Sequence, residues 1–183
     1  MSLLKKNDSI FVAGSNGMVG SSICRLLINN GYSLKSNLLV SDRKDLDLTN
    51  TKKVENWFKL NQPDIVIVAA AKVGGIMANK TKPVDFLLEN LKIQNNLIES
   101  SYKSGVKRLL FLGSSCIYPK FALQPIKEKY ILSGNLENSN QWYAIAKIAG
   151  LKLCEAYRNQ YNFDAISVMP SNLYGPGDNY HYQ

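Results

Sequence analysis

Five short apolar runs, separated by longer amphipathic stretches, form the main hydrophobic pattern of the chain. The third run is apolar throughout, as is typical of a parallel strand buried on both faces. The predicted strands cover 10–13, 37–41, 65–71, 106–112 and 165–169. Helical spacing occupies the stretches between them, including long ones at 83–102 and 143–161. This alternation predicts an α/β fold, a doubly wound parallel sheet with right-handed crossovers.

A glycine-rich turn follows the first predicted strand and opens the first predicted helix. In such a turn the first glycine permits a tight bend, the second lets the backbone approach a pyrophosphate, and the third allows close helix packing. The N-terminus of the following helix then offers N–H groups and positive potential to phosphates. We therefore predict dinucleotide binding by Gly14, Ser15, Asn16, Gly17, Met18, Val19 and Gly20. The alternative is a strand-to-helix turn without a ligand.

The end of the second predicted strand carries Asp42 beside Arg43. At this place in a Rossmann fold, an acidic side chain can bond the ribose hydroxyls of NAD, whereas an arginine can hold the extra phosphate of NADP. Because both types occur side by side, these residues leave NAD and NADP open. Asp47 and Leu48 follow, and we expect them either against the adenine or as a cap before the next helix.

Tyr143 and Lys147 lie four residues apart in a predicted helix, so they share one face. A lysine there can stabilise a tyrosinate and lower the phenol pKa from about 10 toward the working pH. Such a phenol can pass a proton to or from a sugar or alcohol oxygen. Loops after parallel strands open on one rim, which brings this pair near the glycine turn, Ser114 and Cys116. We predict that Ser114 bonds a substrate oxygen, Tyr143 supplies a proton and a nicotinamide delivers hydride.

Composition and charge narrow the function classes. The chain has 183 residues, of which 45% are hydrophobic and 20% charged, as in one globular domain. A net charge of +8 from scattered basic residues suits a nucleotide better than nucleic acid. No apolar run is long enough for a membrane span, and the first residues lack an export signal. With three cysteines and one histidine, we expect a cytoplasmic protein with reduced thiols and no multi-histidine metal site.

Four blocks of sequence carry a resemblance to a known family. They are 69–76 (AAAKVGGI), 112–120 (LGSSCIYPK), 143–150 (YAIAKIAG) and 169–176 (MPSNLYGP). With these blocks the chain resembles the extended short-chain dehydrogenase/reductase superfamily, and within it the GDP-L-fucose synthase family. The resemblance implies a Rossmann domain that uses NADPH and a GDP-4-keto-6-deoxy-D-mannose substrate. It also implies 3,5-epimerisation followed by reduction of the 4-keto group, giving GDP-L-fucose.

The same resemblance implies roles for individual residues. Ser114, Tyr143 and Lys147 match the reductase triad, and Cys116 matches the base of the epimerisation steps. A thiolate can remove a proton next to a ketone once a nearby cation or helix N-terminus lowers its pKa. Cofactor contacts are predicted for the glycine turn and for Asp42, Arg43, Asp47, Leu48, Ala69, Ala70, Ala71, Lys72, Leu112, Gly113, Ser114, Ser115, Tyr143, Lys147, Pro170, Ser171, Asn172 and Leu173. Cys24 and Cys154, both in predicted helices, are interpreted as structural.

The chain departs from the family pattern in two respects. Asn16 and Ser41 stand where the family has arginines that are expected to hold the 2′-phosphate, so the preference for NADP stays open, with Arg43 close by. The family's epimerisation acid is a histidine that falls after the segment of His181, so we do not assign that role to His181. We expect residues 1–183 to form an NAD(P)-binding domain truncated before the substrate domain, binding cofactor with little or no turnover.

Two other functions remain alternatives at this point. One is an NAD-dependent nucleotide-sugar 4-epimerase or 4,6-dehydratase, in which Cys116 has no obvious role. The other is a non-catalytic dinucleotide-binding module. By resemblance we also expect a homodimer through the helices at 83–102 and 143–161. Asn90 is a polar residue within the apolar pattern of the first of these helices, and it needs hydrogen-bond partners if it is buried.

Overall fold

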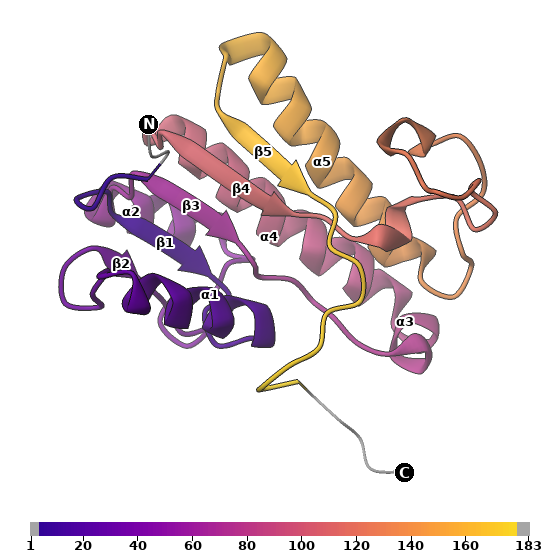
Figure 1. Ribbon diagram of the computed structural model, residues 1–183, viewed down its shortest axis with the longest axis horizontal. Helices are drawn as coiled ribbons and strands as arrows, with labels where there is room; N and C mark the ends of the chain where they lie inside the picture. Colours follow the sequence, from indigo (N-terminus) through magenta and orange to yellow (C-terminus); the bar gives the residue numbers. More distant parts are fainter. Residues whose placement is uncertain (1–3, 179–183) are drawn as a thin grey trace.

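The structure, a computed structural model, describes residues 4–178 and is built on a five-stranded parallel sheet (Figure 1). The order of the strands is β2-β1-β3-β4-β5. Their bounds are Ile10–Ala13 (β1), Leu38–Leu39 (β2), Ile65–Val68 (β3), Arg108–Leu112 (β4) and Ala165–Val168 (β5). The helices are Met18–Asn29 (α1), Thr51–Asn61 (α2), Ile76–Thr81 (α3), Pro83–Lys103 (α4) and Gln141–Tyr161 (α5), with single turns at Ser115–Ile117 (η1) and Glu128–Tyr130 (η2). The predicted doubly wound parallel sheet is confirmed.

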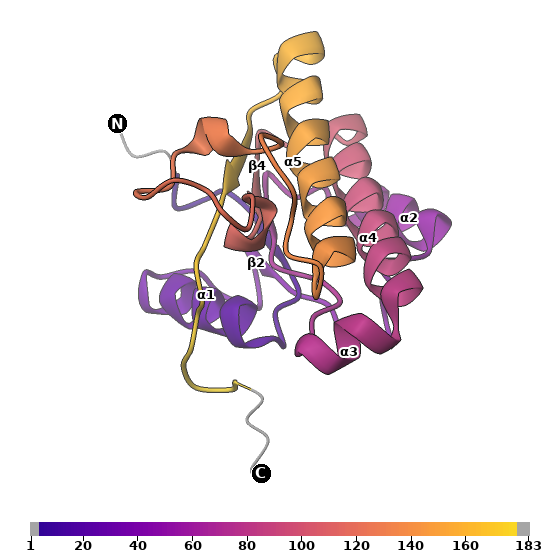
Figure 2. The same cartoon turned by 90° about the vertical axis from the view of Figure 1, so that its right-hand side faces the viewer.

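Helices cover both faces of the sheet. Figure 2 shows α1 on one face and α2, α4 and α5 on the other. The chain moves outward from β1 to β2 and then back past β1 to β3, so right-handed crossovers require α1 and α2 on opposite faces. The reversal of direction between β1 and β3 is the point at which doubly wound sheets bind ligands.

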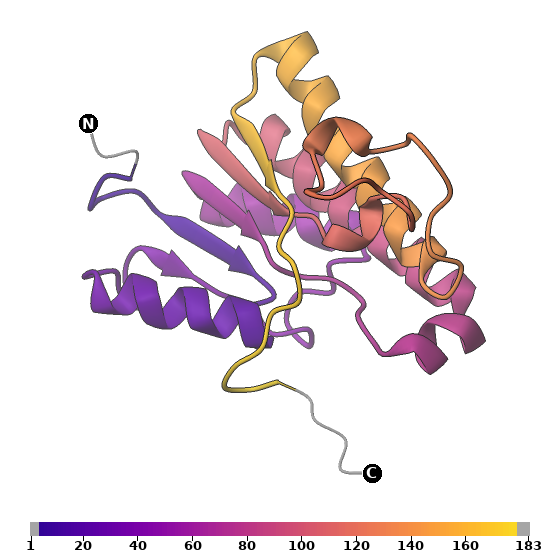
Figure 3. The same cartoon turned by 45° about the vertical axis from the view of Figure 1, so that its right-hand side comes forward.

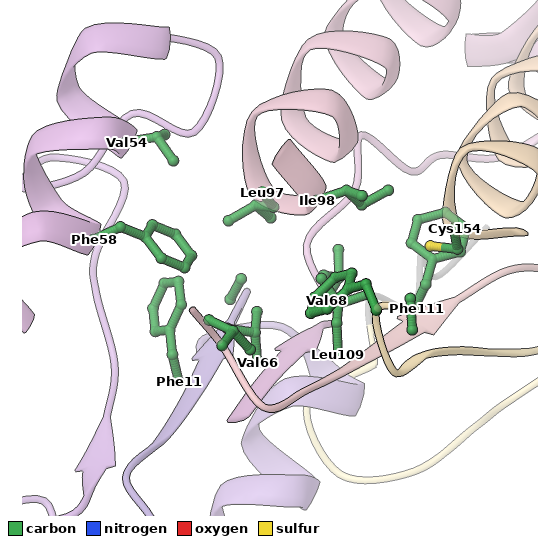
Figure 4. Packing of buried hydrophobic residues seen from close by; sticks show 14 of the residues in the cluster. Phe11, Val54, Phe58, Val66, Val68, Leu97, Ile98, Leu109, Phe111 and Cys154 are labelled. Atoms are coloured by element: carbon green, nitrogen blue, oxygen red, sulfur yellow. The ribbon is translucent and has the colours of Figure 1, made fainter. Parts of the chain in front are cut away.

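Alternate residues of β1 belong to two separate hydrophobic clusters. Phe11 packs in the larger cluster with Phe58 of α2, at a ring-centroid distance of 6.0 Å, and this cluster continues to α4 and α5 (Figure 4). Ile10 and Val12 point to the other face and pack with Leu27 of α1. Burial on both faces explains why these central strands read as continuous apolar runs.

Helices α4 and α5 pack closely against each other and against β4. A methyl group at Gly150 would lie 2.5 Å from Phe111 Cζ and 2.8 Å from Gln94 Cδ, which is too close for any side chain. The buried Gln94 amide donates a hydrogen bond of 2.7 Å to the Ala146 carbonyl. A glycine at position 150 therefore permits the approach that sets α5 over the end of β4.

Two elements differ from the sequence prediction. Strand β2 is shorter than predicted, because it lies at the sheet edge and pairs only with Ile10 and Phe11 before the chain turns at Asp42. Helix α3 is not among the predicted helices, and a glycine pair precedes it. Gly75 instead is its extended N-cap, and the Asn79 amide donates to the carbonyls of Gly74 and Gly75.

Three further features bear on the sequence analysis. Cys24, Cys116 and Cys154 are free thiols, and Cys154 lies fully buried in the larger cluster. Within residues 4–178, every helix is too short or too polar to span a bilayer. The same residues contain no group of three or more acidic, histidine or cysteine side chains that could hold a metal ion. His181 lies outside the described residues.

Candidate functional site

A pocket of about 870 Å³ opens at the carboxyl ends of the strands. Figure 3 shows the strands pointing toward one rim, where the loops that follow β1, β3, β4 and β5 converge. The segment after β5 crosses this rim toward α1, where a Cβ added at Gly177 would lie 4.0 Å from Met18 Cα. These loops are distant in sequence, and together with the loop after β2 they form the walls of one pocket.

Most of the predicted site residues line this pocket. They are Gly14, Asn16, Gly17, Met18, Val19, Arg43, Asp47, Leu48, Ala69, Ala70, Ala71, Leu112, Gly113, Ser114, Tyr143, Lys147, Pro170, Ser171, Asn172 and Leu173. The pocket lining does not include the predicted residues Ser15, Gly20, Asp42, Lys72, Ser115 and Cys116. It does include residues that the sequence analysis missed, namely Ser41, Leu46, Thr49, Val73, Gly74, Gly177 and Asp178. Ser41, Leu46, Thr49 and Val73 directly adjoin predicted residues in the chain, and this proximity was the available signal, whereas Gly177 and Asp178 lie further along the segment after β5.

The glycine turn has the geometry of a phosphate cradle. Gly14 has φ +86°, and a Cβ there would lie 2.7 Å from the Ala70 backbone. A Cβ at Gly20 would lie 2.1 Å from the Gly14 carbonyl oxygen, so Gly20 packs against the turn itself. Gly17 caps α1 without any side-chain hydrogen bond, and the first turn of α1 has no acidic residue. These features leave room and positive potential for the pyrophosphate of a dinucleotide, so the residues present fit such a cofactor.

Lys147 is a buried cation at the opposite end of the pocket. Only 4% of its surface is exposed, and Nζ donates a hydrogen bond of 2.7 Å to the carbonyl of Leu112 at the end of β4. Nζ also lies 4.9 Å from the ring centroid of Phe111 and 5.7 Å from that of Tyr143. Burial lowers the pKa of Lys147 to about 8, because removal from water disfavours the ammonium form.

The pKa of Tyr143 moves in the direction opposite to that predicted from the sequence. Burial raises it well above its usual value, and the nearby Cys116 raises it further. The expectation that Lys147 lowers this pKa is wrong in this structure, because the lysine ammonium is directed to the Leu112 carbonyl while burial disfavours the tyrosinate. The phenol therefore keeps its proton at neutral pH, which is the form that a proton donor requires.

Ser114 and Cys116 follow β4 and lie beside this pair. The Cys116 N–H donates to Ser114 Oγ at 3.3 Å, so Ser114 caps the single turn η1. Burial raises the pKa of the Cys116 thiol, although Ser114 and the charge of Lys147 act in the lowering direction. The expected lowering is therefore wrong as a net effect, because burial outweighs the nearby cation.

Asn90 fixes the loop after β3, which forms one wall of the pocket. It is buried, and its Oδ1 accepts from the Lys72 N–H at 2.8 Å. Its Nδ2 donates to the carbonyls of Lys72 at 3.0 Å and Phe86 at 2.7 Å. The prediction that a buried Asn90 needs hydrogen-bond partners is confirmed.

The loop after β2 shapes the other end of the pocket. Asp47 lines the pocket, and its Oδ1 also accepts from the backbone N–H of Thr49 at 2.9 Å and from the Thr49 hydroxyl at 2.7 Å. These bonds hold the pKa of Asp47 below its usual value. Asn96 donates to the Leu48 carbonyl at 2.9 Å. Asp47 thus stabilises the turn before α2, although the N-cap of α2 is Asn50, and its position against an adenine stays a prediction.

A parallel sheet with a glycine turn at its switch point and a pocket above it defines a Rossmann-type nucleotide-binding domain. Residues 10–183 match the profile of the NAD dependent epimerase/dehydratase family, and the chain belongs to this family.

The similar sequences include several GDP-L-fucose synthases. The chain is 57% identical over 180 residues to GDP-L-fucose synthase 1 of Arabidopsis thaliana, covering 98% of this chain and 55% of the relative. It is 51% identical over 172 residues to GDP-L-fucose synthase of Escherichia coli strain K12, covering 94% and 53%. The chain therefore spans about half the length of these relatives.

Solved structures of nucleotide-sugar enzymes also superpose on this chain. A GDP-mannoheptose C4 reductase from Campylobacter jejuni with NADP bound superposes with a TM-score of 0.91 at 38% identity, covering 96% of this chain and 55% of the other. A GDP-L-fucose synthetase from Naegleria fowleri bound to NADP gives 0.84 at 30% identity, covering 96% and 57%.

Proposed function

We propose that this chain is the cofactor-binding part of an NADP(H)-dependent epimerase/reductase that converts GDP-4-keto-6-deoxy-D-mannose to GDP-L-fucose. The observation that carries the proposal is that Ser114, Tyr143 and Lys147 line the same pocket as the glycine turn. Relatives at 51% and 57% identity are named GDP-L-fucose synthases, and related solved structures hold NADP.

Each pocket residue has a task in this function. The N-terminus of α1 and the glycine turn hold the pyrophosphate. When bound, a nicotinamide cofactor would supply the hydride for C4 of the sugar. Tyr143 donates the proton that the C4 oxygen then needs, and Ser114 hydrogen-bonds the same oxygen. Lys147, held by Leu112, places positive charge beside the phenol as it loses its proton.

Cys116 is proposed to act before reduction. Epimerisation at C3 and C5 requires removal of a proton next to the 4-keto group and its return on the other face. The thiol lies outside the pocket lining, and the proposal is supported by the hydrogen bond of 3.3 Å from the Cys116 N–H to Ser114 Oγ of the triad. Because burial raises its pKa, Cys116 depends on Lys147 and Ser114 to reach the thiolate form.

We further propose that residues 1–183 act as the NAD(P)-binding domain of a cytoplasmic enzyme that does not bind nucleic acid. We assign binding of the GDP-sugar substrate to the half of the relatives' sequence that this chain does not match. A homodimer through α4 and α5 is also proposed. Its support is the exposed apolar side chains on these helices, which include Val84, Leu88, Trp142 and Ile145.

The test is an incubation with GDP-4-keto-6-deoxy-D-mannose and NADPH, following loss of NADPH and formation of GDP-L-fucose. It is run with this chain alone and with the C-terminal half of the Escherichia coli relative added as a second polypeptide. Turnover in either reaction supports the proposal. Binding of NADPH without turnover in both reactions supports a non-catalytic module instead. Turnover of another nucleotide sugar with NAD alone supports a 4-epimerase or 4,6-dehydratase.

A further inference from the structure

We propose that Phe111 is a positioning residue for Lys147, and that the face of its buried ring holds the lysine ammonium, in its charged form, beside the Tyr143 phenol. The inference rests on the proposed function for the purpose of that charge, which is to support the phenol as it gives up its proton. It adds the group that keeps a cation in a place from which water is nearly excluded.

The ammonium of Lys147 meets two aromatic rings and one carbonyl group. Nζ lies 4.9 Å from the ring centroid of Phe111 and 5.7 Å from that of Tyr143, and both distances are within the range of cation–π attraction. The Leu112 carbonyl accepts a hydrogen bond of 2.7 Å from Nζ. Because Phe111 and Leu112 are consecutive residues of β4, one short piece of strand supplies both the ring and the carbonyl.

The Phe111 ring has little freedom to move away from this place. It is fully buried in the larger hydrophobic cluster and points from β4 toward α5 (Figure 4). Gly150 follows Lys147 by three residues and so lies on the same face of α5. A Cβ at position 150 would lie 2.5 Å from Phe111 Cζ. The missing side chain at Gly150 therefore admits the ring to its position beside the ammonium.

Within residues 4–178, the titratable groups around Lys147 supply no counterion. Tyr143 lies one turn earlier on α5 and Cys116 faces Lys147 from η1, and burial raises the pKa of both, which keeps them neutral at neutral pH. Helix α4 presents the neutral amide of Gln94 to this part of α5. Lys147 takes part in none of the ion pairs of this part of the chain. The electron-rich face of the Phe111 ring therefore offsets part of the cost of removing the ammonium from water.

The alternative is that Phe111 only fills the core, and the two interpretations give opposite signs when the ring is removed. Burial lowers the pKa of Lys147 to about 8 from an ordinary value of 10.5. A core that is merely loosened admits water, which raises this pKa back toward its ordinary value. Loss of an attraction for the ammonium instead lowers the pKa further.

The experiment is an NMR titration of the protein labelled with ¹³C at the lysine ε-carbons, with the Lys147 signal assigned by its absence in Lys147→Met. Phe111→Leu should lower the Lys147 pKa by about 0.5–1 unit, because the cation–π attraction is lost. Difluorophenylalanine at position 111 keeps the shape of the ring and withdraws electron density from its face. It should lower the same pKa by a smaller amount, and it decides the matter if Phe111→Leu does not fold.

Phe58→Leu is the matched control, because Phe58 is fully buried in the same cluster and its ring packs on Phe11 and Trp57. It should lower the free energy of unfolding about as much as Phe111→Leu does, and leave the Lys147 pKa unchanged. An unchanged or raised Lys147 pKa in either variant at position 111 would overturn the inference. An equal fall in Phe58→Leu would overturn it as well.

The purpose of the held charge is tested in the turnover assay. Phe111→Leu should move the alkaline fall of kcat to lower pH by the same amount as the NMR pKa, with KM for NADPH nearly unchanged. A pH profile that stays in place would overturn the role of Phe111 in the reaction. The NMR titration needs neither cofactor nor substrate, so absence of turnover by the wild type would count against the proposed function and leave the titration to decide whether Phe111 holds the ammonium.

Discussion

At the scale of single residues, burial decides the chemistry of the site more than neighbouring charge does. Lys147, Tyr143 and Cys116 influence one another electrostatically, yet desolvation is the largest cause of the pKa shift in each. All three shifts favour the neutral form at alkaline pH. The spacing of Tyr143 and Lys147 could be predicted from the sequence, but the sign of these shifts could not. Desolvation and the Leu112 carbonyl come from chain segments far away in sequence.

The first residue-scale prediction concerns Lys147 and pH. Its folded-state pKa is about 8, below the ordinary value of 10.5, so the unfolded chain binds the proton more tightly. The stability contributed by Lys147 is therefore lowest below pH 8 and rises as the pH increases toward 10.5. Relative to Lys147→Met, the wild-type free energy of unfolding should gain on the order of 3 kcal/mol across this window.

Urea denaturation of both proteins at several pH values measures this difference. Titration of groups distant from Lys147 cancels between the two proteins. A difference that stays constant from pH 7 to pH 11, or that shrinks with rising pH, would contradict the assignment of a buried lysine with a lowered pKa.

The second residue-scale prediction separates proton donation from binding. Tyr143→Phe keeps the ring that contacts the Lys147 ammonium and removes only the phenol hydroxyl. Carbonyl reduction should fall by about 10²- to 10⁴-fold, the usual contribution of a positioned acid, while NADPH affinity should change by less than about twofold. Stopped-flow absorbance and calorimetry measure the two quantities. Reduction at the wild-type rate would show that another group donates the proton.

At the scale of elements, hydrogen bonds from helix side chains to loops build the walls of the pocket. Asn90 of α4 holds the loop after β3, and Gln94, one turn further along α4, holds α5 through Ala146. The long helices and central strands could be predicted because their apolar periodicity is strong. The shortening of β2 and the presence of helix α3 could not be predicted from the sequence. β2 depends on its edge position, and α3 depends on Asn79 bonding to two glycine carbonyls.

The element-scale prediction concerns Asn90→Ala. The substitution removes three hydrogen bonds and leaves the N–H and carbonyl of Lys72 without those partners. The free energy of unfolding should fall by about 2–4 kcal/mol, because groups buried without partners carry the full cost of desolvation. NADPH affinity should also fall, since the loop that lines the pocket is no longer fixed.

Asn61→Ala is the control for this prediction. Asn61 makes one exposed bond, to the carbonyl of Trp57, within α2. Its loss should change the free energy of unfolding by less than about 0.5 kcal/mol, as is usual for surface positions. Thermal and urea unfolding give both values. Equal effects of the two substitutions would refute a specific role for Asn90.

At the scale of the whole molecule, the pocket exists only because the ends of all five strands meet on one rim. The glycine turn near the N-terminus, the loops after β2, β3 and β4, and the segment after β5 contribute to one lining. The sequence predicted this meeting from the alternation of strands and helices, since parallel strands end on the same side. It could not predict that Glu89 of α4 links the loops after β2 and β3, because that contact depends on side-chain placement across the pocket.

The most direct measurement for the whole account is a crystal structure of the protein with NADPH bound. The account predicts one extended cofactor along the pocket. Its adenosine end lies at Arg43, its pyrophosphate at the N-terminus of α1, and its nicotinamide beside Tyr143 and Ser114. A cofactor bound outside this pocket, or one whose nicotinamide lies away from the Tyr143 hydroxyl, would contradict the account.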